Sequence, residues 1–390
     1  MPEDPCRWSF YCTVELFPIS NGSLIFNIDD FLSGMDVLFP DGFEGFNIII
    51  NDFGKVTINS TLFNGHLSLN IINSNQIIVS QSNMTRIYIE GSKSILATNN
   101  IFSIGATIFN SSNIMISNNV IPELRFFQVE NSSILNNDIY LSFRNEFTLN
   151  SIIMGNYFSM EEGFIIKDGK YILFRNNVVK RIIISEQSQP SINFYDLENL
   201  NITENNFVSS NLHLYNITYY NVSKNVFTDC YDNFCFRAVI SKSGLVSNNS
   251  FSDFSQVFDY ICPRPGRVYD ICYENPKKAL SIVSLVGTND TIIENLYFAN
   301  FTAIKGQSTD DDLIIGINLI HLTRTNNIRI TNINYEKITI DSDIQEFKII
   351  ECYECNYNYN SDNIGLNSYF IFFILLGIFL LASLGLKKRN

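Results

Sequence analysis

Pairs of asparagine followed at once by apolar residues recur along the chain at intervals of roughly 20 residues. Aligned on the second asparagine of each pair, the series comprises Asn100, Asn119, Asn137, Asn156, Asn177, Asn206, Asn225, Asn249, Asn295 and Asn332. Most of these asparagines have an apolar residue three positions before and two positions after, as Ile116 and Ile121 flank Asn119. Self-similarity at a fixed period indicates a repeat architecture.

The flanking apolar residues require a bend at each asparagine. Two inward-facing residues five positions apart cannot share one straight strand, because side chains alternate along a strand with a period of two. Asparagine tolerates the left-handed backbone conformation that a tight bend needs. In stacked coils, equivalent amides would lie ~4.8 Å apart and could hydrogen bond to each other as a ladder. The sequence therefore predicts a solenoid of stacked β-coils.

The stretches NIMISNNVI and NVSKNVF fit a pattern of the type I-x-I-x-x-N-x-F. This pattern resembles the right-handed parallel β-helix repeats of the pectate-lyase-like family, here in the form of a membrane-anchored, protist-type surface member. The resemblance implies an all-β fold, a right-handed single-stranded parallel β-helix with its asparagine ladder at a turn between two of three sheets. Abundant isoleucine, phenylalanine and tyrosine favour strands as well. The placement of leucine does not fit leucine-rich repeats, which have a similar period.

The pattern and its interruptions predict the domain organisation. We expect an N-terminal cap over 1–44, a β-helix over 45–355 with loop insertions near 228–276 and 305–313, a stalk over 356–368, a transmembrane helix over 369–386 and a cytoplasmic tail over 387–390.

The predicted transmembrane helix is the uncharged stretch YFIFFILLGIFLLASLGL. As a helix it would span ~27 Å, close to the thickness of a bilayer's hydrocarbon core. The basic residues of KKRN follow it directly, which predicts a single-pass type I topology with the body extracellular or lumenal. A buried core helix and a glycolipid-anchor signal are the alternatives. Lys387 and Lys388 also resemble a dilysine retrieval signal, so the plasma membrane and the endoplasmic reticulum are both candidate locations.

The first residues, MPEDPCRWSFYC, do not have the basic and apolar regions of a signal peptide. We expect a secretory signal upstream of Met1, and insertion by the tail is the alternative.

Cysteine usage supports an exterior location. The eight cysteines form four close pairs, which predict disulfides that staple loops: Cys6 with Cys12, Cys230 with Cys235, Cys262 with Cys272, and Cys352 with Cys355. Zinc at CYEC is the alternative, although neither a second CxxC nor a histidine pair accompanies it. Candidate glycosylation sequons lie at Asn21, Asn59, Asn83, Asn110, Asn131, Asn201, Asn216, Asn221, Asn248, Asn289 and Asn300.

Catalytic motifs are sparse. The Gly-His-Gly and Arg-x-Lys motifs of polygalacturonases do not occur, and His66, His213 and His321 are isolated, which favours structural roles for them. Pectate lyases use calcium held by acidic side chains, so the resemblance leaves weak calcium candidates at Asp310, Asp311 and Asp312. Weak catalytic candidates are Asp270, Asp290, Asp310 and Asp312, of which three are about 20 residues apart and could share one face. A solvated acidic loop explains Asp310–Asp312 equally well.

The formal net charge of −13 argues against nucleic acid as a partner. The expected partners are the lipid bilayer, through residues 369–386, and a glycan or an extracellular protein. Arg264 and Arg267 could meet uronate carboxylates, or could simply be a charged loop tip. We therefore predict a membrane-anchored recognition, adhesion or scaffold ectodomain. A membrane-anchored lyase or glycoside hydrolase for acidic polysaccharide is the alternative, with calcium as the one cofactor considered.

Overall fold

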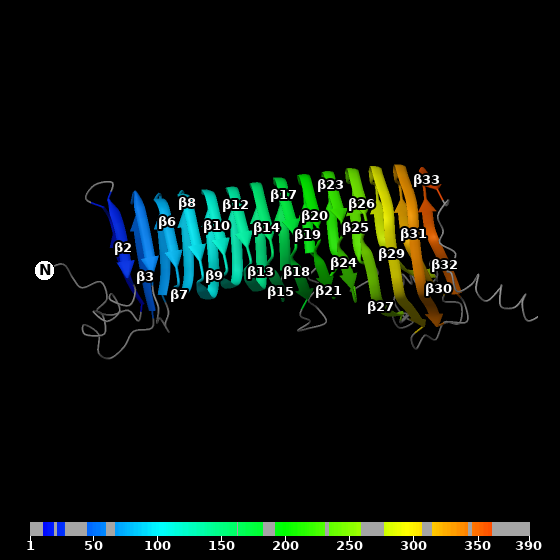
Figure 1. The fold of residues 1–390 in the computed structure, drawn as a ribbon, viewed down its shortest axis with the longest axis horizontal. Coiled ribbons are helices and arrows are strands. Elements are labelled where there is room, and N and C mark those ends of the chain that lie inside the picture. The colour runs from blue at the N-terminus through cyan, green and yellow to red at the C-terminus, as the bar shows by residue number, and fades with distance from the viewer. Residues whose placement is uncertain are drawn as a thin grey trace, which may run out of the picture.

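The computed structural model describes residues 11–18, 22–27, 45–59, 67–161, 163–181, 192–230, 234–258, 277–305, 314–341 and 345–360. These residues form 33 β-strands, and every strand pairing among them is parallel. The strands stack along one axis into an elongated rod, with the chain advancing steadily from one end to the other (Figure 1). The described residues contain no α-helix. The chain is thus all-β, and the long parallel sheet is consistent with the right-handed parallel β-helix expected from the sequence.

Each full coil contributes strands to three sheets, which we call A, C and B in chain order. Sheet A contains β2 (Ser23–Asn27), β4 (Lys55–Asn59), β6 (Asn75–Ser80), β8 (Lys93–Thr98), β10 (Ser112–Ser117), β12 (Glu130–Leu135), β14 (Leu149–Met154), β17 (Lys170–Arg175), β20 (Glu198–Thr203), β23 (Thr218–Ser223), β26 (Lys242–Ser247), β29 (Asn289–Lys305), β31 (Asn326–Asp341) and β33 (Tyr357–Asn360). The separate strands of sheet C are β15 (Tyr157–Met160), β18 (Val178–Arg181), β21 (Asn206–Val208), β24 (Val226–Thr228) and β27 (Ser250–Phe258).

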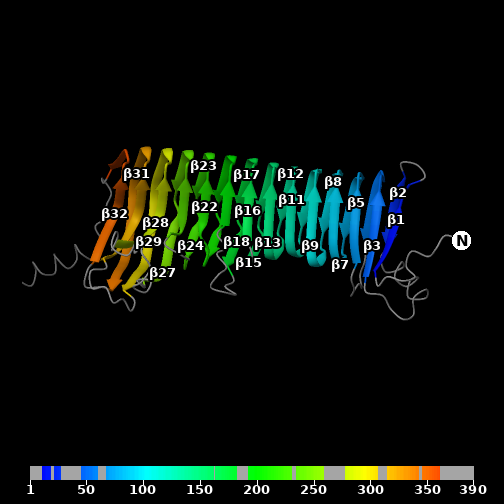
Figure 2. The same cartoon turned by 180° about the vertical axis from the view of Figure 1, so that it is seen from behind.

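Sheet B is the third face of the rod. It contains β1 (Tyr11–Leu16), β3 (Gly45–Asn51), β5 (Leu67–Ile72), β7 (Asn83–Glu90), β9 (Ile101–Phe109), β11 (Val120–Phe127), β13 (Asp138–Glu146), β16 (Gly163–Lys167), β19 (Ile192–Tyr195), β22 (Leu212–Tyr215), β25 (Phe236–Val239), β28 (Lys277–Val286), β30 (Ile314–Thr323) and β32 (Gln345–Tyr353). Some strands bend and serve two sheets: β7, β9, β11 and β13 begin in sheet C, and β29 and β31 end there. Figure 2 shows the stack from behind.

The turn from sheet A to sheet C explains why asparagine occurs in pairs. The first residue of each pair has a left-handed backbone, as at Asn99, Asn118, Asn136 and Asn176. The second residue has a buried side chain and forms the ladder, whose rungs are Asn100, Asn119, Asn137, Asn156, Asn177, Asn205, Asn225 and Asn249. Our expectation that one asparagine performs both roles was wrong. The bend needs a residue with a left-handed backbone and the ladder needs a buried amide side chain. Two adjacent residues supply these two features.

The ladder hydrogen bonds join neighbouring coils. Asn119 Oδ1 accepts from the backbone N of Asn100 at 2.8 Å and from its Nδ2 at 2.9 Å. Asn119 Nδ2 donates to Asn137 Oδ1 at 2.9 Å and to Ala97 O at 3.0 Å. The same amide-to-amide bond links every later rung as far as Asn249. Each rung therefore satisfies both its own amide and a buried backbone group of the preceding coil.

Three predicted rungs are wrong. In ENNFV the rung is Asn205, while Asn206 is exposed, because Phe207 and not Val208 points into the core. Further on, Leu296 and Ile333 are buried one position after Asn295 and Asn332. The ladder thus gives way to an aliphatic column. Asn332 Nδ2 donates instead to Asn295 Oδ1 at 2.9 Å in an exposed pair.

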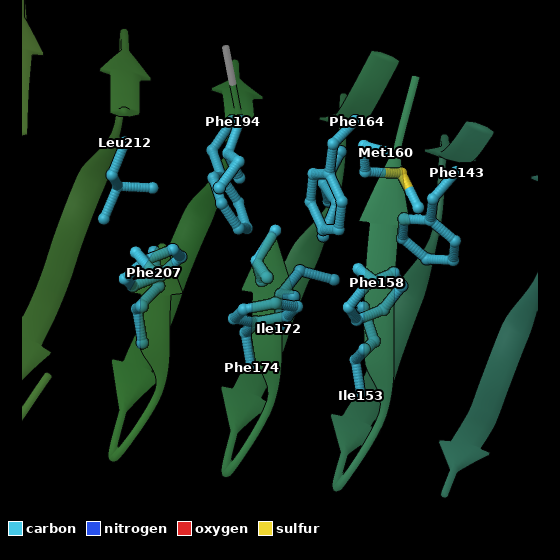
Figure 3. Close-up of a cluster of buried hydrophobic side chains, with 14 of the residues drawn as sticks. Phe143, Ile153, Phe158, Met160, Phe164, Ile172, Phe174, Phe194, Phe207 and Leu212 are labelled. Atoms are coloured by element: carbon cyan, nitrogen blue, oxygen red, sulfur yellow. The ribbon is translucent and has the colours of Figure 1, made fainter. Parts of the chain in front are cut away.

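The core between the sheets is a set of stacked apolar columns. Phe207, Phe227, Phe251 and Phe298 follow one another with ring centroids 4.7–5.1 Å apart and nearly parallel planes. Figure 3 shows an adjoining part of the core, where rings from facing strands interdigitate. Such columns bury apolar surface continuously along the rod, which is what allows a solenoid of short strands to fold.

The parallel pairing extends beyond the predicted bounds of the β-helix. Strand β1 pairs with β3 and β2 pairs with β4, so residues assigned to the cap form the first coil. Strand β33 pairs with β31, so residues 357–360 belong to the rod and not to a stalk. Within the described ranges no helix is long and apolar enough to cross a membrane. The predicted span 369–386 and tail 387–390 lie outside those ranges.

The core contains one asparagine that no partner satisfies. Asn145 is completely buried between Phe126 and Ile166 of the neighbouring coils, and neither its Oδ1 nor its Nδ2 has a hydrogen-bond partner among the described residues. Asn145→Leu is expected to raise the free energy of unfolding by about 1–3 kcal/mol, because it removes two unsatisfied polar atoms at similar volume. Urea unfolding checks this, with the exposed Asn358→Leu as the control. A loss of stability in Asn145→Leu would contradict the expectation.

Candidate functional site

The outer face of sheet B carries a continuous polar column. One outward column, read from the strand register, contains Tyr88, Thr107, Arg125, Arg144, Ile165, Asn193, His213, Arg237, Ser284, His321 and Glu351. The matching column of sheet A is largely apolar from Ile78 to Ile292 and then continues with two polar residues: Ile78, Leu96, Met115, Ser133, Ile152, Leu173, Asn201, Asn221, Leu245, Ile292, Arg329 and Asn358. Charged side chains are therefore more frequent in this column of sheet B than in the matching column of sheet A.

Four gaps between the described ranges precede strands of sheet B. Residues 182–191, 231–233, 259–276 and 306–313, which lie outside the described ranges, each connect a sheet C strand to the next sheet B strand. The two predicted insertions, near 228–276 and 305–313, both include such a connection. Loops on a regular scaffold commonly carry function. The edge where sheet B begins is therefore the place where this chain departs most from its repeat.

A hollow of about 180 Å³ lies near the N-terminal end of sheet B. It is lined by Arg86, Thr107, Glu123 and Arg125, and Arg125 forms an ion pair with Glu123 at 2.8 Å. Gly105 also lines the hollow, and a Cβ there would lie 2.3 Å from the carbonyl oxygen of Glu123. The close approach of the two coils at this point therefore requires glycine.

Aromatic and basic side chains cluster in the middle of sheet B. Tyr195 lies 6.3 Å from His213 and 6.2 Å from Tyr215 between ring centroids. The rings of His213 and Phe234 are 6.2 Å apart, and the guanidinium of Arg237 lies 5.7 Å from the centre of the Phe234 ring. His213 and Arg237 are neighbours in register on β22 and β25. We call these five residues the central cluster.

Two polar atoms of the central cluster have no partner. His213 Nε2 and Arg237 Nε are buried and make no hydrogen bond with any described residue. Burial, and after it the charge of Arg237, lowers the pKa of His213 from 6.5. The imidazole is therefore neutral near pH 7, and its Nε2 stays unpaired, as does the Nε–H of Arg237. Buried polar atoms normally find partners, so these two atoms are exceptions among the described residues.

Acidification is expected to weaken the fold through His213. Because its folded-state pKa lies below 6.5, the unfolded chain binds this proton more tightly. The stability that neutral His213 contributes is thus present above about pH 6.5 and is lost as the pH falls through the folded-state pKa. His213→Gln should flatten the pH dependence of the free energy of unfolding between about pH 7.5 and about pH 5. Urea titrations across that range test this, and an unaltered pH dependence would refute it.

A polar network occupies the C-terminal end of sheet B. Glu351 Oε2 lies 3.1 Å from His321 Nδ1 and accepts from Asn318 Nδ2 at 2.5 Å, while Lys348 donates to Glu351 Oε1 at 3.0 Å. Burial alone would raise the pKa of Glu351, but the hydrogen bonds from Lys348 and His321 outweigh it and lower that pKa below 4.5. Thr323 Oγ1 is 2.7 Å from His321 Nε2. His321 is thus held from both sides.

The order hydroxyl, imidazole, carboxylate is also that of a nucleophilic triad. A triad needs in addition a pair of donors for the developing oxyanion. Strand β30 is paired on both edges, with β28 and with β32, so its backbone amides around Thr323 are engaged in the sheet. We therefore assign this network to closing the end of sheet B.

Among the sequence-predicted aspartates, Asp290 is the one that lies in the described structure. Asp290 is exposed at the start of β29, on sheet A, and accepts from Asn327 Nδ2 at 2.8 Å. The residues one coil away from it in register are Ser243 and Asn327, so a spacing of about 20 residues is not one coil step at this point. The remaining predictions of this group, Asp270, Asp310, Asp311, Asp312, Arg264, Arg267 and His66, lie outside the described residues. Within the described ranges, no three His, Cys, Asp or Glu side chains are placed to hold a metal ion.

Two of the predicted disulfides are confirmed. Cys230 bonds Cys235 next to the central cluster, with both residues buried, and Cys352 bonds Cys355 at the C-terminal end of the rod. The first disulfide closes the loop that carries Phe234, and so fixes one wall of the cluster.

The other two predicted disulfides stay predictions. Cys12 lies in β1, where the structure describes its backbone but not its side chain, and its expected partner Cys6 lies outside the described residues. Cys272 lies outside the described residues as well, together with its expected partner Cys262. Neither the bond between Cys6 and Cys12 nor the bond between Cys262 and Cys272 is therefore part of the described structure.

The sequons are unevenly distributed over the rod. Those within strands of sheet A are at Asn59, Asn131, Asn201, Asn221 and Asn289, and those within sheet C are at Asn83 and Asn300. Three more lie in turns, at Asn110, Asn216 and Asn248, and Asn21 lies outside the described residues. The described residues on sheet B itself include several asparagines but none in a sequon. Asn110 and Asn216 directly follow β9 and β22, so an N-glycan at Asn216 would attach one residue after Tyr215 of the central cluster.

Comparison with known proteins identifies similar folds but no close relative. No protein-family model matches the chain, and no curated protein does. Among solved structures, an exopolygalacturonase from Thermotoga maritima aligns at 11% identity over 85% of this chain and 92% of its own, with a TM-score of 0.31. A family 28 exopolygalacturonase from Yersinia enterocolitica aligns at 10% identity over 87% and 79%, with a TM-score of 0.22.

A third similar structure is the tailspike protein 3 of bacteriophage CBA120. It aligns at 9% identity over 91% of this chain and 50% of its own, with a TM-score of 0.24. Similarity at this level says nothing about activity. The assignment of the β-helix therefore rests on the chain's own strand register and ladder.

Proposed function

We propose that this chain is a carbohydrate-recognition protein that binds acidic polysaccharide on the outer face of sheet B. The observation that carries the proposal is the pair of buried, unpartnered atoms His213 Nε2 and Arg237 Nε among aromatic rings. An anionic sugar substituent would accept from the guanidinium, and a hydroxyl would pair with the neutral imidazole. The rings of Tyr195, Tyr215 and Phe234 supply apolar surface for the faces of sugar rings.

The proposal places the rod in an exterior compartment. The disulfides Cys230–Cys235 and Cys352–Cys355 fit such a location, because disulfides form and persist in oxidising compartments.

The proposal includes a membrane anchor. The apolar residues 369–386 followed by KKRN would hold the rod on the exterior or lumenal side of a membrane. The test is expression of the full precursor in cultured cells, followed by alkaline extraction and glycosidase digestion. We expect the protein to stay in the membrane pellet and to lose mass when N-glycans are removed. Release into the supernatant would contradict the anchor, and an unchanged mass would contradict the exterior location.

Binding itself is tested with immobilised polysaccharides. The purified rod is applied to polygalacturonate and hyaluronate, which are acidic, and to xylan and mannan as neutral references. We expect retention on at least one acidic polymer and a loss of affinity of at least about tenfold in the His213→Ala/Arg237→Met variant. Met115→Ala, on the outer face of sheet A, is the matched control and should bind as the wild type does. Failure to bind any of the polymers, or equal binding by both variants, would refute the proposal.

A further inference from the structure

A disulfide occupies core-facing positions in the last described coil of the rod, between β32 and β33 (Figure 1). Cys352 pairs in register with Leu322, and Cys355 lies across the turn at the position that Thr325 occupies one coil earlier. Leu322 and Thr325 are buried, because the coils before and after theirs cover them. Among the described residues no coil follows that of Cys352, which is exposed. The disulfide thus lies at the end of the described core.

The described cysteines differ in accessibility. Cys352 is exposed, whereas Cys355 is half-buried and packs against the core. The cysteines of the other described disulfide, Cys230 and Cys235, are 2% and 0% exposed. Exchange begins when a thiolate reaches a disulfide sulfur, and exposed disulfides are the ones that serve as labile, regulatory or catalytic bonds. An incoming thiolate can therefore reach Cys352 far more easily than Cys230 or Cys235.

Stabilisation of the fold is a weak reason for the exposed bond. Its two cysteines are three residues apart in sequence, so it closes a very short loop and removes little freedom from the unfolded chain. Backbone hydrogen bonds hold the same turn without it. Arg324 N donates to Tyr353 O at 2.9 Å. Asn356 N donates to Thr325 O, also at 2.9 Å. These bonds would keep the turn in place when the disulfide is open.

The spacing of the two cysteines suits a reversible reaction. Their Cα atoms are 5.8 Å apart on one turn. When a thiolate attacks Cys352, the released thiolate of Cys355 stays beside the mixed disulfide. It can attack that bond in turn and expel the incoming thiol. One cysteine is thus placed to react with a partner and the other to resolve the product.

We propose that Cys352 and Cys355 form a thiol–disulfide exchange site. A thiolate of a dithiol partner attacks Sγ of Cys352, the S–S bond breaks, and Cys355 leaves as a thiolate. The partner's second thiolate then attacks the partner's own sulfur in the mixed disulfide and releases Cys352. Two electrons and two protons pass from the partner, which becomes a disulfide, to this chain, which becomes a dithiol. The proposal does not depend on carbohydrate binding.

The surroundings of the bond favour a thiol carried by a protein. Tyr353 lies between the two cysteines in sequence and is 59% exposed. Tyr357, two residues after Cys355, is 39% exposed. Tyrosine is enriched in the contact surfaces between proteins. A protein dithiol and a small thiol such as glutathione share the exchange chemistry, and the two tyrosines offer contact surface to the protein.

The first test measures the rate of reduction in the wild type. The oxidised full chain is treated with glutathione or with a peptide that contains two cysteines, and its free thiols are alkylated at intervals and identified by peptide mass. We expect Cys352–Cys355 to open at least about tenfold faster than Cys230–Cys235, with the peptide recovered as a disulfide. Equal rates for the two bonds would overturn the proposal. Faster reaction with glutathione than with the peptide would overturn its protein partner.

The second test separates the roles of the two cysteines. With glutathione disulfide as the probe, Cys355→Ser should accumulate a mixed disulfide at Cys352, because no second cysteine resolves it. Cys352→Ser should react at Cys355 at least about tenfold more slowly, because Cys355 is half-buried. In the reduced wild type the adduct should be transient. Equal rates in the two variants, or a lasting adduct in the wild type, would contradict the assigned roles.

The variant that lacks both cysteines distinguishes exchange from a structural role. Cys352→Ser/Cys355→Ser should keep a thermal midpoint within about 4 °C of the wild type's, because the loop is short and the turn keeps its hydrogen bonds. It should also leave the dithiol peptide reduced. A larger fall of the midpoint would mean that the bond is a structural staple, and unchanged oxidation of the peptide would assign the activity to other cysteines.

Discussion

Asn119→Leu is expected to lower the free energy of unfolding by about 3–5 kcal/mol, since each buried polar group left without a partner costs ~1–3 kcal/mol. The substitution removes the acceptor of the Asn100 backbone N–H and the donor to Ala97 O, both of which are buried. It also breaks the amide-to-amide ladder between Asn100 and Asn137. The shape of leucine is not the cause, because Leu296 occupies the equivalent position of a later coil.

Urea unfolding of Asn119→Leu measures the loss directly. Asn358→Leu is the matched control, because Asn358 is exposed on the last strand, and we expect less than about 0.5 kcal/mol there. Equal stability of the two variants would show that the ladder contributes nothing beyond filling space.

Gly244→Leu is expected to destabilise the rod by about 3 kcal/mol or more, because it forces a side chain into occupied space. A Cβ on Gly244 would lie 2.0 Å from Cζ of Tyr220 in the preceding coil. Tyr220 is buried and extends across the coil of Gly244 to reach Thr291, whose Oγ1 lies 3.1 Å from the phenolic oxygen. Burial also raises the pKa of Tyr220, so the phenol stays protonated. The large side chain of Tyr220 thus occupies the space that a side chain at Gly244 of the next coil would need.

A double-mutant cycle tests the packing of Tyr220 over Gly244. Tyr220→Ala alone should cost about 3–5 kcal/mol through the cavity that it leaves. In Tyr220→Ala/Gly244→Leu the new side chain partly fills that cavity, so the double variant should be more stable than the sum of the single losses implies. Strict additivity of the two losses would contradict the shared volume. Thermal and urea unfolding of the four proteins supply the data.

The architecture was predictable because most coils repeat the same short sequence pattern at the same turn. A left-handed residue followed by a buried amide reads in the sequence as an asparagine pair, and Ile116 and Ile121 mark the bend on either side of Asn119. The register was ambiguous at the pair Asn205 and Asn206, because an apolar residue lies two positions after each of them. These residues are Phe207 and Val208, and either could have pointed into the core. The end of the ladder was missed because Asn295 preserves the pair's appearance while Leu296 occupies the rung.

The candidate site could not be predicted in the same way. His213, Arg237 and Ser284 are neighbours on sheet B, but the chain between one coil and the next varies in length with each insertion. Spacing in sequence therefore does not report which outward residues align, and the register neighbours of Asp290 are Ser243 and Asn327.

Carbohydrate binding on the outer face of sheet B is the central claim, and hydroxyl-radical footprinting tests it most directly. The rod is oxidised with and without a saturating amount of polygalacturonate or hyaluronate, and side-chain oxidation is read by mass spectrometry. Tyr195, Tyr215 and Phe234 should become protected, while Met115, 43% exposed on the outer face of sheet A, should be oxidised equally in both states. Protection of Met115 with no change at the three rings would contradict the account.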